Sequence, residues 1–194
     1  VLRPNLPCTL DFGRRMSEIR SGLGHPDRAG YVPAHAMTPP DPRPPAPPRA
    51  LPRVRVSCRE EFSAAHQLVA PGLDERQNRA LYGPCADLHG HNYTIELTVE
   101  GPVEPGTGMV VNFVSLFGLL REAVLGPCDH KNLNTDVPCL HGRITTAENM
   151  VVAFWELLAP QVAAQPGCQL VRIGLSETSR TRVEYAGPSG YTSA

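Results

Sequence analysis

The chain has 194 residues, of which 41% are hydrophobic, and a formal net charge of −1 at pH 7. It therefore fits one large domain, or one domain with an appendage, and lacks the basic surface typical of general nucleic-acid or membrane binding. No segment approaches the length of an apolar transmembrane helix, and residues 1–30 lack the apolar run of a secretory signal. The six cysteines form no Cys-x-x-Cys pair, which predicts reduced thiols and a cytoplasmic location.

The N-terminal segment is dominated by proline. Residues 1–52 hold 12 of the 21 prolines, most densely in the stretch TPPDPRPPAPPRALP. Proline lacks a backbone N–H and has a fixed φ, so such a segment sustains neither a helix nor a central strand. We therefore expect residues 1–52 to be disordered and residues 53–194 to form the folded domain.

Two strands with alternating apolar residues open the predicted domain. From Val54 to His66 the even-numbered positions are apolar except for Glu60 and end at His66, whereas the odd-numbered positions from Arg55 to Ser63 are polar. From His91 onward the odd-numbered positions form the apolar face, and His89 shares that face if the strand reaches back to it. Two half-buried strands are expected, with these residues on their apolar faces: Val54, Val56, Cys58, Phe62 and Ala64; Tyr93, Ile95, Leu97 and Val99.

Two helices follow the strands. Asn112 is the predicted N-cap of the first helix, which ends at Gly126-Pro127. The second is predicted to begin at Thr145, with Glu148 three residues later in a capping-box pattern. Each helix carries an apolar stripe at helical spacing: Phe113, Leu116, Phe117, Leu120 and Val124; Val151, Phe154, Trp155, Leu158 and Val162.

Two more strands complete the pattern. Val171, Ile173 and Leu175 alternate on one face of the third strand, Glu177 continues that face, and residues 181–186 form the fourth strand. Helices that lie between two hairpins cover one face of an antiparallel sheet, so we predict an α+β fold of ββααββ order. Its core is thin and its edge strands are unpaired, which predicts a homo-oligomer.

Three histidines lie at the ends of the first two predicted strands, on the apolar faces. They are His66, His89 and His91. Buried histidines are often only hydrogen-bonded core residues, but three on neighbouring inner faces favour a metal site. A neutral imidazole is a good zinc ligand, and three protein ligands with one open position are typical of catalytic zinc.

Cys85 lies four residues before His89 in a turn-rich stretch. A thiol close to a metal and cationic groups can have a lowered pKa and act as a base or nucleophile. A fourth metal ligand and an inert small residue are the alternatives. Asp129 and His130 follow the first predicted helix, and such a pair can form a proton relay, although on its own it is common and unspecific.

Three further polar residues are candidates for ligand binding. Glu177 ends an apolar stripe, where an ionised carboxylate needs a partner such as a ligand with paired N–H donors. A strand-end carboxylate that turns to solvent is the alternative. Thr146 and Glu148 lie at the start of the second predicted helix, where capping alone accounts for them. The sequence has no Walker-type phosphate loop and no nucleophile elbow.

The motifs FSAAH, CADLHGHNY, GMVVNF, CDHKNLN, TAEN and SET occur in this order along the chain. Together they resemble the 6-pyruvoyl-tetrahydropterin synthase superfamily over residues 54 to about 187. The resemblance implies the tunnelling fold, in which trimers stack as hexamers and the active sites lie between subunits. The segment 1–52 has no counterpart in this family.

The loop before the histidines separates branches of this superfamily. Its Cys-x3-His-Gly-His spacing is similar to the bacterial 6-carboxy-tetrahydropterin synthases of queuosine biosynthesis, whereas the pyruvoyl enzymes of animals usually have two more residues. A folate-pathway branch has glutamate in place of Cys85. Two departures are Asn112, where bacterial relatives usually have aspartate, and the DHKNLNTDVP run, which looks closer to the animal enzymes.

The resemblance implies a role for each candidate residue. Cys85 would be the general base, Asp129 and His130 its relay partners, and Glu177 the anchor of the pterin's guanidine-like edge. Zinc would be held by the three histidines, His66, His89 and His91. The pocket would be lined by two further residues, Thr146 and Glu148.

The implied reaction converts 7,8-dihydroneopterin triphosphate to 6-carboxy-5,6,7,8-tetrahydropterin, with release of acetaldehyde and triphosphate. The main alternative is a 6-pyruvoyl-tetrahydropterin synthase, which has the same site and a different product. A second alternative is a non-catalytic pterin-binding or zinc-structural member. The intact set of Cys85, Asp129 and His130 argues against that alternative.

Overall fold

A computed structural model of the chain describes residues 50–190, and the disorder predicted for residues 1–52 lies almost wholly outside this range. The helices and strands are β1 (Arg53–His66), α1 (Glu75–Tyr82), η1 (Gly83–Ala86), β2 (His89–Pro102), α2 (Phe113–Leu120), η2 (Arg121–Leu125), α3 (Gly126–Cys128), β3 (Lys131–Asn132), η3 (Pro138–Leu140), α4 (Ala147–Ala163), β4 (Gln169–Thr178) and β5 (Thr181–Tyr185). None of the helices in this range is long and apolar enough to cross a bilayer.

The strands form one sheet in the order β3-β1-β2-β4-β5. The β1–β2, β2–β4 and β4–β5 pairs are antiparallel, as predicted. The short strand β3 was not predicted, and it pairs in parallel with β1 at Ala64 and Ala65. The predicted α+β class is confirmed, and the sheet is mixed only through this two-residue edge strand.

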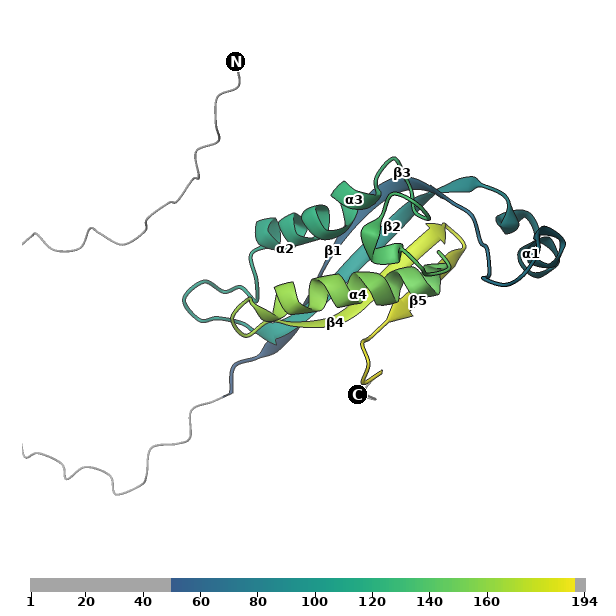
Figure 1. The fold of residues 1–194 in the computed structure, drawn as a ribbon. Coiled ribbons are helices and arrows are strands. Elements are labelled where there is room, and N and C mark those ends of the chain that lie inside the picture. Colours follow the sequence, from purple (N-terminus) through teal and green to yellow (C-terminus); the bar gives the residue numbers. More distant parts are fainter. Residues whose placement is uncertain (1–49, 191–194) are drawn as a thin grey trace, which may run out of the picture. The chain divides into compact units, whose positions relative to one another are not determined.

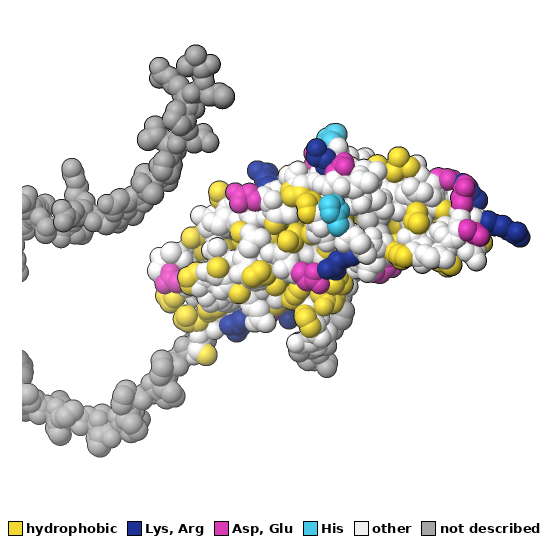
Figure 2. All heavy atoms as spheres, viewed as in Figure 1, with side chains coloured by type: hydrophobic (Ala, Val, Ile, Leu, Met, Phe, Trp, Pro, Cys, Tyr) yellow, Lys and Arg dark blue, Asp and Glu magenta, His cyan; other side chains and the backbone are white. Residues whose placement is uncertain are grey.

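The helices α2 and α4 lie across one face of the sheet (Figure 1). The predicted alternation decides which side chains they cover, because successive residues of a strand point to opposite faces. Tyr93, Ile95, Leu97 and Val99 are completely buried, and they pack against helix residues such as Phe154. The space-filling view of this side shows hydrophobic side chains among the polar ones over the same region (Figure 2).

Glu60, which interrupts the apolar face of β1, has a partner on the helix layer. Its carboxylate lies 2.7 Å from the guanidinium of Arg121, and the guanidinium also lies over the Phe117 ring. Arg121 begins the π-turn η2, which continues α2 directly into α3. A π-turn inserts one extra residue into the helix. The ion pair between Glu60 and Arg121 explains how an acidic residue is accommodated on the covered face.

The first predicted helix has the expected start and a different end. The Asn112 side chain accepts a hydrogen bond from the backbone N–H of Val114, so the predicted N-cap is confirmed. The prediction that Gly126-Pro127 ends the helix is wrong, because these residues begin α3 and the helical path runs on to Cys128. Proline is tolerated in the first turn of a helix, and here that first turn follows a π-turn.

The second predicted helix begins one residue later than expected. Thr146 is the N-cap of α4, and its hydroxyl accepts from the backbone N–H of Asn149. The predicted capping box of Thr145 and Glu148 is therefore wrong. Thr145 is instead fully buried, and its hydroxyl accepts a hydrogen bond from the side-chain amide of Asn134.

A β-bulge changes which residues of β4 reach the core. The register pairs Thr98 with Arg172 but Val99 with Leu170, so one extra residue lies between the two pairs. Leu170 is consequently buried and Val171, predicted to face the core, is only half-buried. Beyond the bulge Ile173 and Leu175 are completely buried, as predicted.

The connection between β1 and β2 contains a helix that the strand pattern did not predict. Asp74 caps α1 through a capping box with Gln77. The helix lies beyond the end of the sheet, away from α2 and α4 (Figure 1). Nearly all of its residues are exposed, and only Asn78 is buried. A helix without a buried apolar face needs no apolar stripe in its sequence, so the pattern did not reveal it.

Candidate metal centre and active site

The three predicted histidines come together at one end of the sheet. His66 and His89 are directly opposite in the β1–β2 ladder, and His91 lies one inward-facing position further along β2. The ring centroids are 4.5 Å apart for His66 and His89, and 5.1 Å apart for His66 and His91. One ligand nitrogen from each ring lies within 4.8 Å of the other two, so the three rings can bind one metal ion.

Backbone carbonyls fix the tautomer of two of these rings. The Nδ1 atom of His66 is 2.8 Å from the carbonyl oxygen of Thr145, and the Nδ1 atom of His89 is 2.8 Å from that of Asp87. A carbonyl oxygen only accepts hydrogen bonds, so each Nδ1 carries the proton and each Nε2 carries a lone pair when the ring is neutral. The two Nε2 atoms lie 3.1 Å apart. Two lone pairs at this distance repel unless a cation or a proton lies between or beside them.

Burial favours the neutral form of two of the rings, His66 and His91. His66 is 2% exposed, and the loss of solvation lowers its pKa to about 4, although the hydrogen bond to Thr145 opposes the shift. Burial also lowers the pKa of His91, and the nearby His89 adds to the effect. Metals bind the neutral imidazole, so at neutral pH these two rings do not need to lose a proton before they bind. The residues therefore fit a transition-metal ion.

The aromatic residues Tyr93 and Phe62 lie beside the histidines. The two rings stack at a centroid distance of 5.0 Å, and Tyr93 meets the His91 ring edge-on at 5.5 Å. Tyr93 also meets the His66 ring edge-on at 6.0 Å. These contacts restrict the orientation of two metal-ligand candidates. The sequence pattern identified Tyr93 only as a core residue.

Glu177 lies close to the histidines and to Glu148. Burial raises the pKa of the Glu177 carboxyl, the negative charge of Glu148 raises it further, and His89 opposes the shift. Glu177 is half-buried, whereas Glu148 is exposed in the first turn of α4. The predicted ligand-binding residues are thus near each other. Thr146 is adjacent in sequence, and its hydroxyl is used to cap α4.

Cys85 is held near the end of β1. It lies in the turn η1, is half-buried, and its carbonyl oxygen accepts a hydrogen bond from the backbone N–H of Leu68 at 2.8 Å. Within residues 50–190, the cluster of close metal-ligand atoms contains the three histidines and no cysteine. Cys85 is therefore a free thiol in the described residues and is not one of the clustered metal-ligand candidates.

Asp129 and His130 form a pair at the edge of β1, beside Ser63. One Asp129 carboxylate oxygen accepts from the backbone N–H of Ser63 at 2.9 Å, and the other lies 2.9 Å from Nδ1 of His130. The Ser63 N–H and then His130 lower the pKa of the Asp129 carboxyl. In the described part of the chain neither residue hydrogen-bonds to Cys85.

The backbone of His130 is strained. Its φ is 57°, a left-handed conformation that non-glycine residues rarely adopt. Its N–H donates to the Ser63 carbonyl at 2.6 Å, and its side chain is 82% exposed. Such strain is often found at functional sites, where the surrounding structure holds the residue in place.

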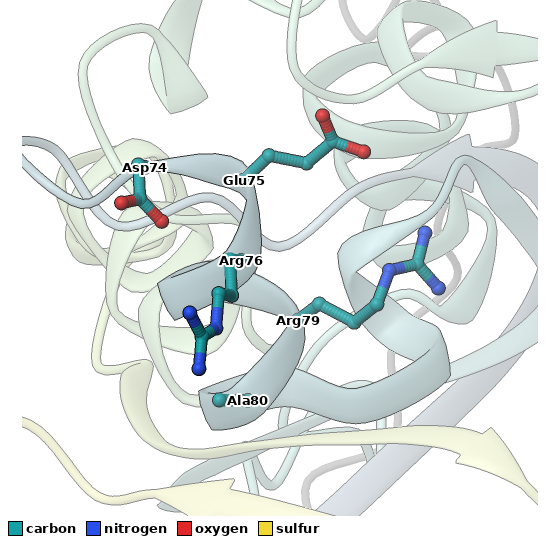
Figure 3. Close-up of a pocket in the computed structure, with 5 residues that line it drawn as sticks. All are labelled: Asp74, Glu75, Arg76, Arg79 and Ala80. Carbon is teal, nitrogen blue, oxygen red and sulfur yellow. The ribbon is translucent and has the colours of Figure 1, made fainter.

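An open surface hollow on α1 is separate from this centre. It is lined by Asp74, Glu75, Arg76, Arg79 and Ala80 (Figure 3). None of these residues was predicted to belong to the site. Arg79 forms a bidentate ion pair with Asp87, whose carbonyl holds His89, so this helix supports the histidines indirectly.

The chain is similar in sequence to known proteins. The profile of the family described as "6-pyruvoyl tetrahydropterin synthase" matches residues 55–188. A 6-pyruvoyl tetrahydrobiopterin synthase of Dictyostelium discoideum is 38% identical over 134 residues, which are 69% of this chain and 96% of that protein. An Archaeoglobus fulgidus protein, provisionally assigned as a 6-carboxy-5,6,7,8-tetrahydropterin synthase, is 30% identical over 116 residues, which are 60% of this chain and 81% of that protein.

The fold of the chain is also similar to that of a solved structure. The 6-pyruvoyl tetrahydropterin synthase of Caenorhabditis elegans superposes with a TM-score of 0.64 and 29% identity, covering 71% of this chain and 98% of that chain. The match therefore spans nearly the whole of that chain. From the family profile and the identity to its relatives, the chain belongs to the 6-pyruvoyl tetrahydropterin synthase family.

Proposed function

We propose that this protein is a zinc-dependent lyase that eliminates triphosphate from 7,8-dihydroneopterin triphosphate. The observation that carries the proposal is the histidine centre, in which two Nε2 lone pairs lie 3.1 Å apart beside a half-buried glutamate. Membership in the 6-pyruvoyl tetrahydropterin synthase family supports a pterin as the substrate. The reaction expected from this family starts from the side chain of the pterin and ends with loss of its triphosphate.

Three histidines would hold the zinc ion, His66, His89 and His91. When bound, the ion supplies Lewis-acid chemistry that lowers the pKa of substrate hydroxyl groups. Cys85 would remove a carbon-bound proton from the substrate side chain as its thiolate. Its half-buried position in the turn four residues before His89 supports this role, since a nearby cation favours the thiolate.

Glu177 would bind the pterin ring. A pterin has a ring N–H and an exocyclic amine side by side, and a carboxylate accepts from both. Burial and Glu148 raise the pKa of Glu177, so the ionised form is costly while no donor faces it. A ligand with paired donors relieves that cost. Glu148 and Thr146 would line the same pocket.

Asp129 and His130 would complete the site from a neighbouring subunit of a trimer or hexamer. In one chain the pair lies on the edge of β1, His130 is 82% exposed, and neither residue hydrogen-bonds to Cys85. The relay proposed for these residues therefore needs a second chain. The outer edges of β1 and β5, which have no strand beside them for most of their length in residues 50–190, are suited to join subunits.

The product is proposed to be 6-pyruvoyl-tetrahydropterin. This choice is supported by the 38% identity to a eukaryotic pyruvoyl synthase, compared with 30% to the archaeal carboxy-type protein. The second candidate is the 6-carboxy product of the queuosine pathway, which the short Cys-x3-His-Gly-His spacing favours. A cytoplasmic location is part of either proposal and is supported by five free cysteines in residues 50–190.

The test is to incubate the purified, zinc-loaded protein with 7,8-dihydroneopterin triphosphate and analyse the products by mass spectrometry. Release of triphosphate with a pyruvoyl product supports the first candidate, and a carboxy product with acetaldehyde supports the second. The control is Cys139→Ala, which removes a half-buried thiol in η3, outside the proposed site. If the protein binds zinc and leaves the substrate intact, the proposed reaction is wrong.

A further inference from the structure

The hydroxyl group of Tyr93 has no hydrogen-bond partner, although the residue is completely buried. The ring itself is well accommodated, because it stacks on Phe62 and meets the His66 and His91 rings edge-on. A phenylalanine would make the same ring contacts without burying an unsatisfied hydroxyl group. The hydroxyl group therefore lowers the stability of the unliganded chain. A buried polar group without a partner suggests that it makes a hydrogen bond in another state of the protein.

The sheet register identifies one polar neighbour of Tyr93. Thr94 pairs with Ser176 across β2 and β4, so continuing the ladder by one residue sets Tyr93 opposite Glu177. Both side chains lie on the helix-covered face, since they alternate with Thr94 and Ser176. Directly opposite residues have Cβ atoms about 4.5–5.5 Å apart, within reach of a hydrogen bond between a long acidic side chain and a phenol.

The two groups are chemically complementary. The phenol can donate one hydrogen bond, and an ionised carboxylate can accept several. Within residues 50–190 the Glu177 carboxylate has no hydrogen bond or ion pair, so donor and acceptor are both unused. Glu177 also contributes to the raised pKa of Tyr93, in agreement with their proximity.

We propose that Tyr93 is a positioning residue that donates a hydrogen bond to the Glu177 carboxylate when this carboxylate binds the pterin. This inference rests on the proposed function. The hydrogen bond fixes one carboxylate oxygen and selects one rotamer of Glu177. The remaining lone pairs of the carboxylate then face the paired N–H donors of the ligand. Because the Glu177 side chain is already ordered, ligand binding does not include the entropic cost of ordering it.

The experiment measures the binding of biopterin, an unreactive pterin without triphosphate, to the zinc-loaded protein by titration calorimetry. Tyr93→Phe should weaken binding about tenfold, because a hydrogen bond to a charged group is lost. Its zinc content should equal that of the parent, and its melting temperature should be equal or higher. Tyr185→Phe is the matched control, since Tyr185 packs on Trp155 away from the histidines and should bind biopterin like the parent.

A double-mutant cycle tests whether Tyr93 acts through Glu177. Glu177→Gln alone should weaken binding strongly, and adding Tyr93→Phe should weaken it no further. If Glu177→Gln binds too weakly to measure, Glu177→Asp replaces it, since it keeps the charge and shortens the side chain. Additive losses would mean that Tyr93 acts independently of Glu177 and would overturn the inference.

Two other results would also overturn it. Tyr93→Phe could bind biopterin as tightly as the parent, in which case the hydroxyl group positions nothing. It could instead lose zinc or melt at a lower temperature, in which case its role is structural. In both cases the parent still binds the pterin and the proposed function stands. A parent that does not bind biopterin or turn over the substrate contradicts the proposed function itself, and this inference with it.

Discussion

The Nε2 atoms of His66 and His89 lie 3.1 Å apart, while the Nδ1 atom of each ring donates its proton to a backbone carbonyl. This arrangement follows from the β1–β2 register, which sets the two residues directly opposite each other, and from the chain segments that supply the carbonyls. Two neutral rings held in this way direct lone pairs at each other. A bound cation removes the repulsion, and the third histidine, His91, completes a set of ligands on one side of it.

We expect one metal ion per chain, and we expect His89→Ala to lose it. His89 suits the test better than His66, because His66 is buried and ties β1 to Thr145, so its loss also disturbs folding. Metal analysis of the purified variants measures the content. His141→Ala is the control, since this exposed histidine lies outside the cluster. A His89→Ala protein with the parent's metal content would show that the ion is bound elsewhere.

The metal-free protein should lose stability on acidification from pH 6.5 to about 4. Burial lowers the pKa of His66 from 6.5 to about 4, so in this range the unfolded chain binds a proton that the folded chain does not. The stability contributed by His66 is thus present above pH 6.5 and is lost as the pH falls to about 4. The loss is on the order of 3 kcal/mol, since each pKa unit corresponds to about 1.4 kcal/mol.

Denaturant unfolding at several pH values measures this effect. His66→Asn should show a weaker pH dependence, because the asparagine amide can replace the Nδ1 donor to Thr145 and does not titrate. His141→Asn, which changes an exposed ring, should unfold with the same pH dependence as the parent. Equal pH dependence in His66→Asn and the parent would mean that another group is responsible.

Cys85→Ala should reduce turnover by about 10²–10⁴-fold, the usual contribution of a general base, and leave metal content and melting temperature unchanged. The fold is retained because the contact that holds this turn uses the backbone carbonyl of residue 85, which alanine keeps. Steady-state release of triphosphate gives the rate. Cys139→Ala should retain the parent's rate. Near-parental activity of Cys85→Ala would make His130 the next candidate for the base.

The sequence predicted the parts of the fold that depend on alternation, and it missed those that depend on a single inserted residue or on tertiary contacts. The face of β2 from His91 to Val99 was predicted correctly, because period-two burial is a local property. The bulge at Val171 and the π-turn that begins at Arg121 each add one residue, and no composition signal marks them. Helix α1 was missed because an exposed helix carries no apolar stripe.

The candidate site shows the same division. The three histidines were predicted to share a face, and the strand register brings them together. The carbonyl partners of His66 and His89 come from Thr145 and Asp87, and the sequence gives no sign of these contacts. The polar use of Tyr93 was also missed, because an apolar stripe predicts burial and says nothing about an unsatisfied hydroxyl group.

The pair of half-buried Asp129 and exposed His130 leads to the last prediction, which concerns subunit sharing. If these residues act on Cys85 of a neighbouring chain, Cys85→Ala and His130→Ala variants should be inactive alone and partly active when they assemble together. Random assembly in equal amounts restores about one quarter of the sites, because each site needs an intact thiol from one chain and an intact histidine from the next.

The measurement is triphosphate release after the two variants are unfolded together, mixed and refolded with zinc. Each variant refolded alone is the control for residual activity, and the refolded parent gives the full rate. Recovery near one quarter means that the thiol and the histidine come from different subunits. Mixed oligomers that form and stay inactive would place all three residues in one chain, and the exposed His130 of the isolated subunit would then have to turn toward its own Cys85.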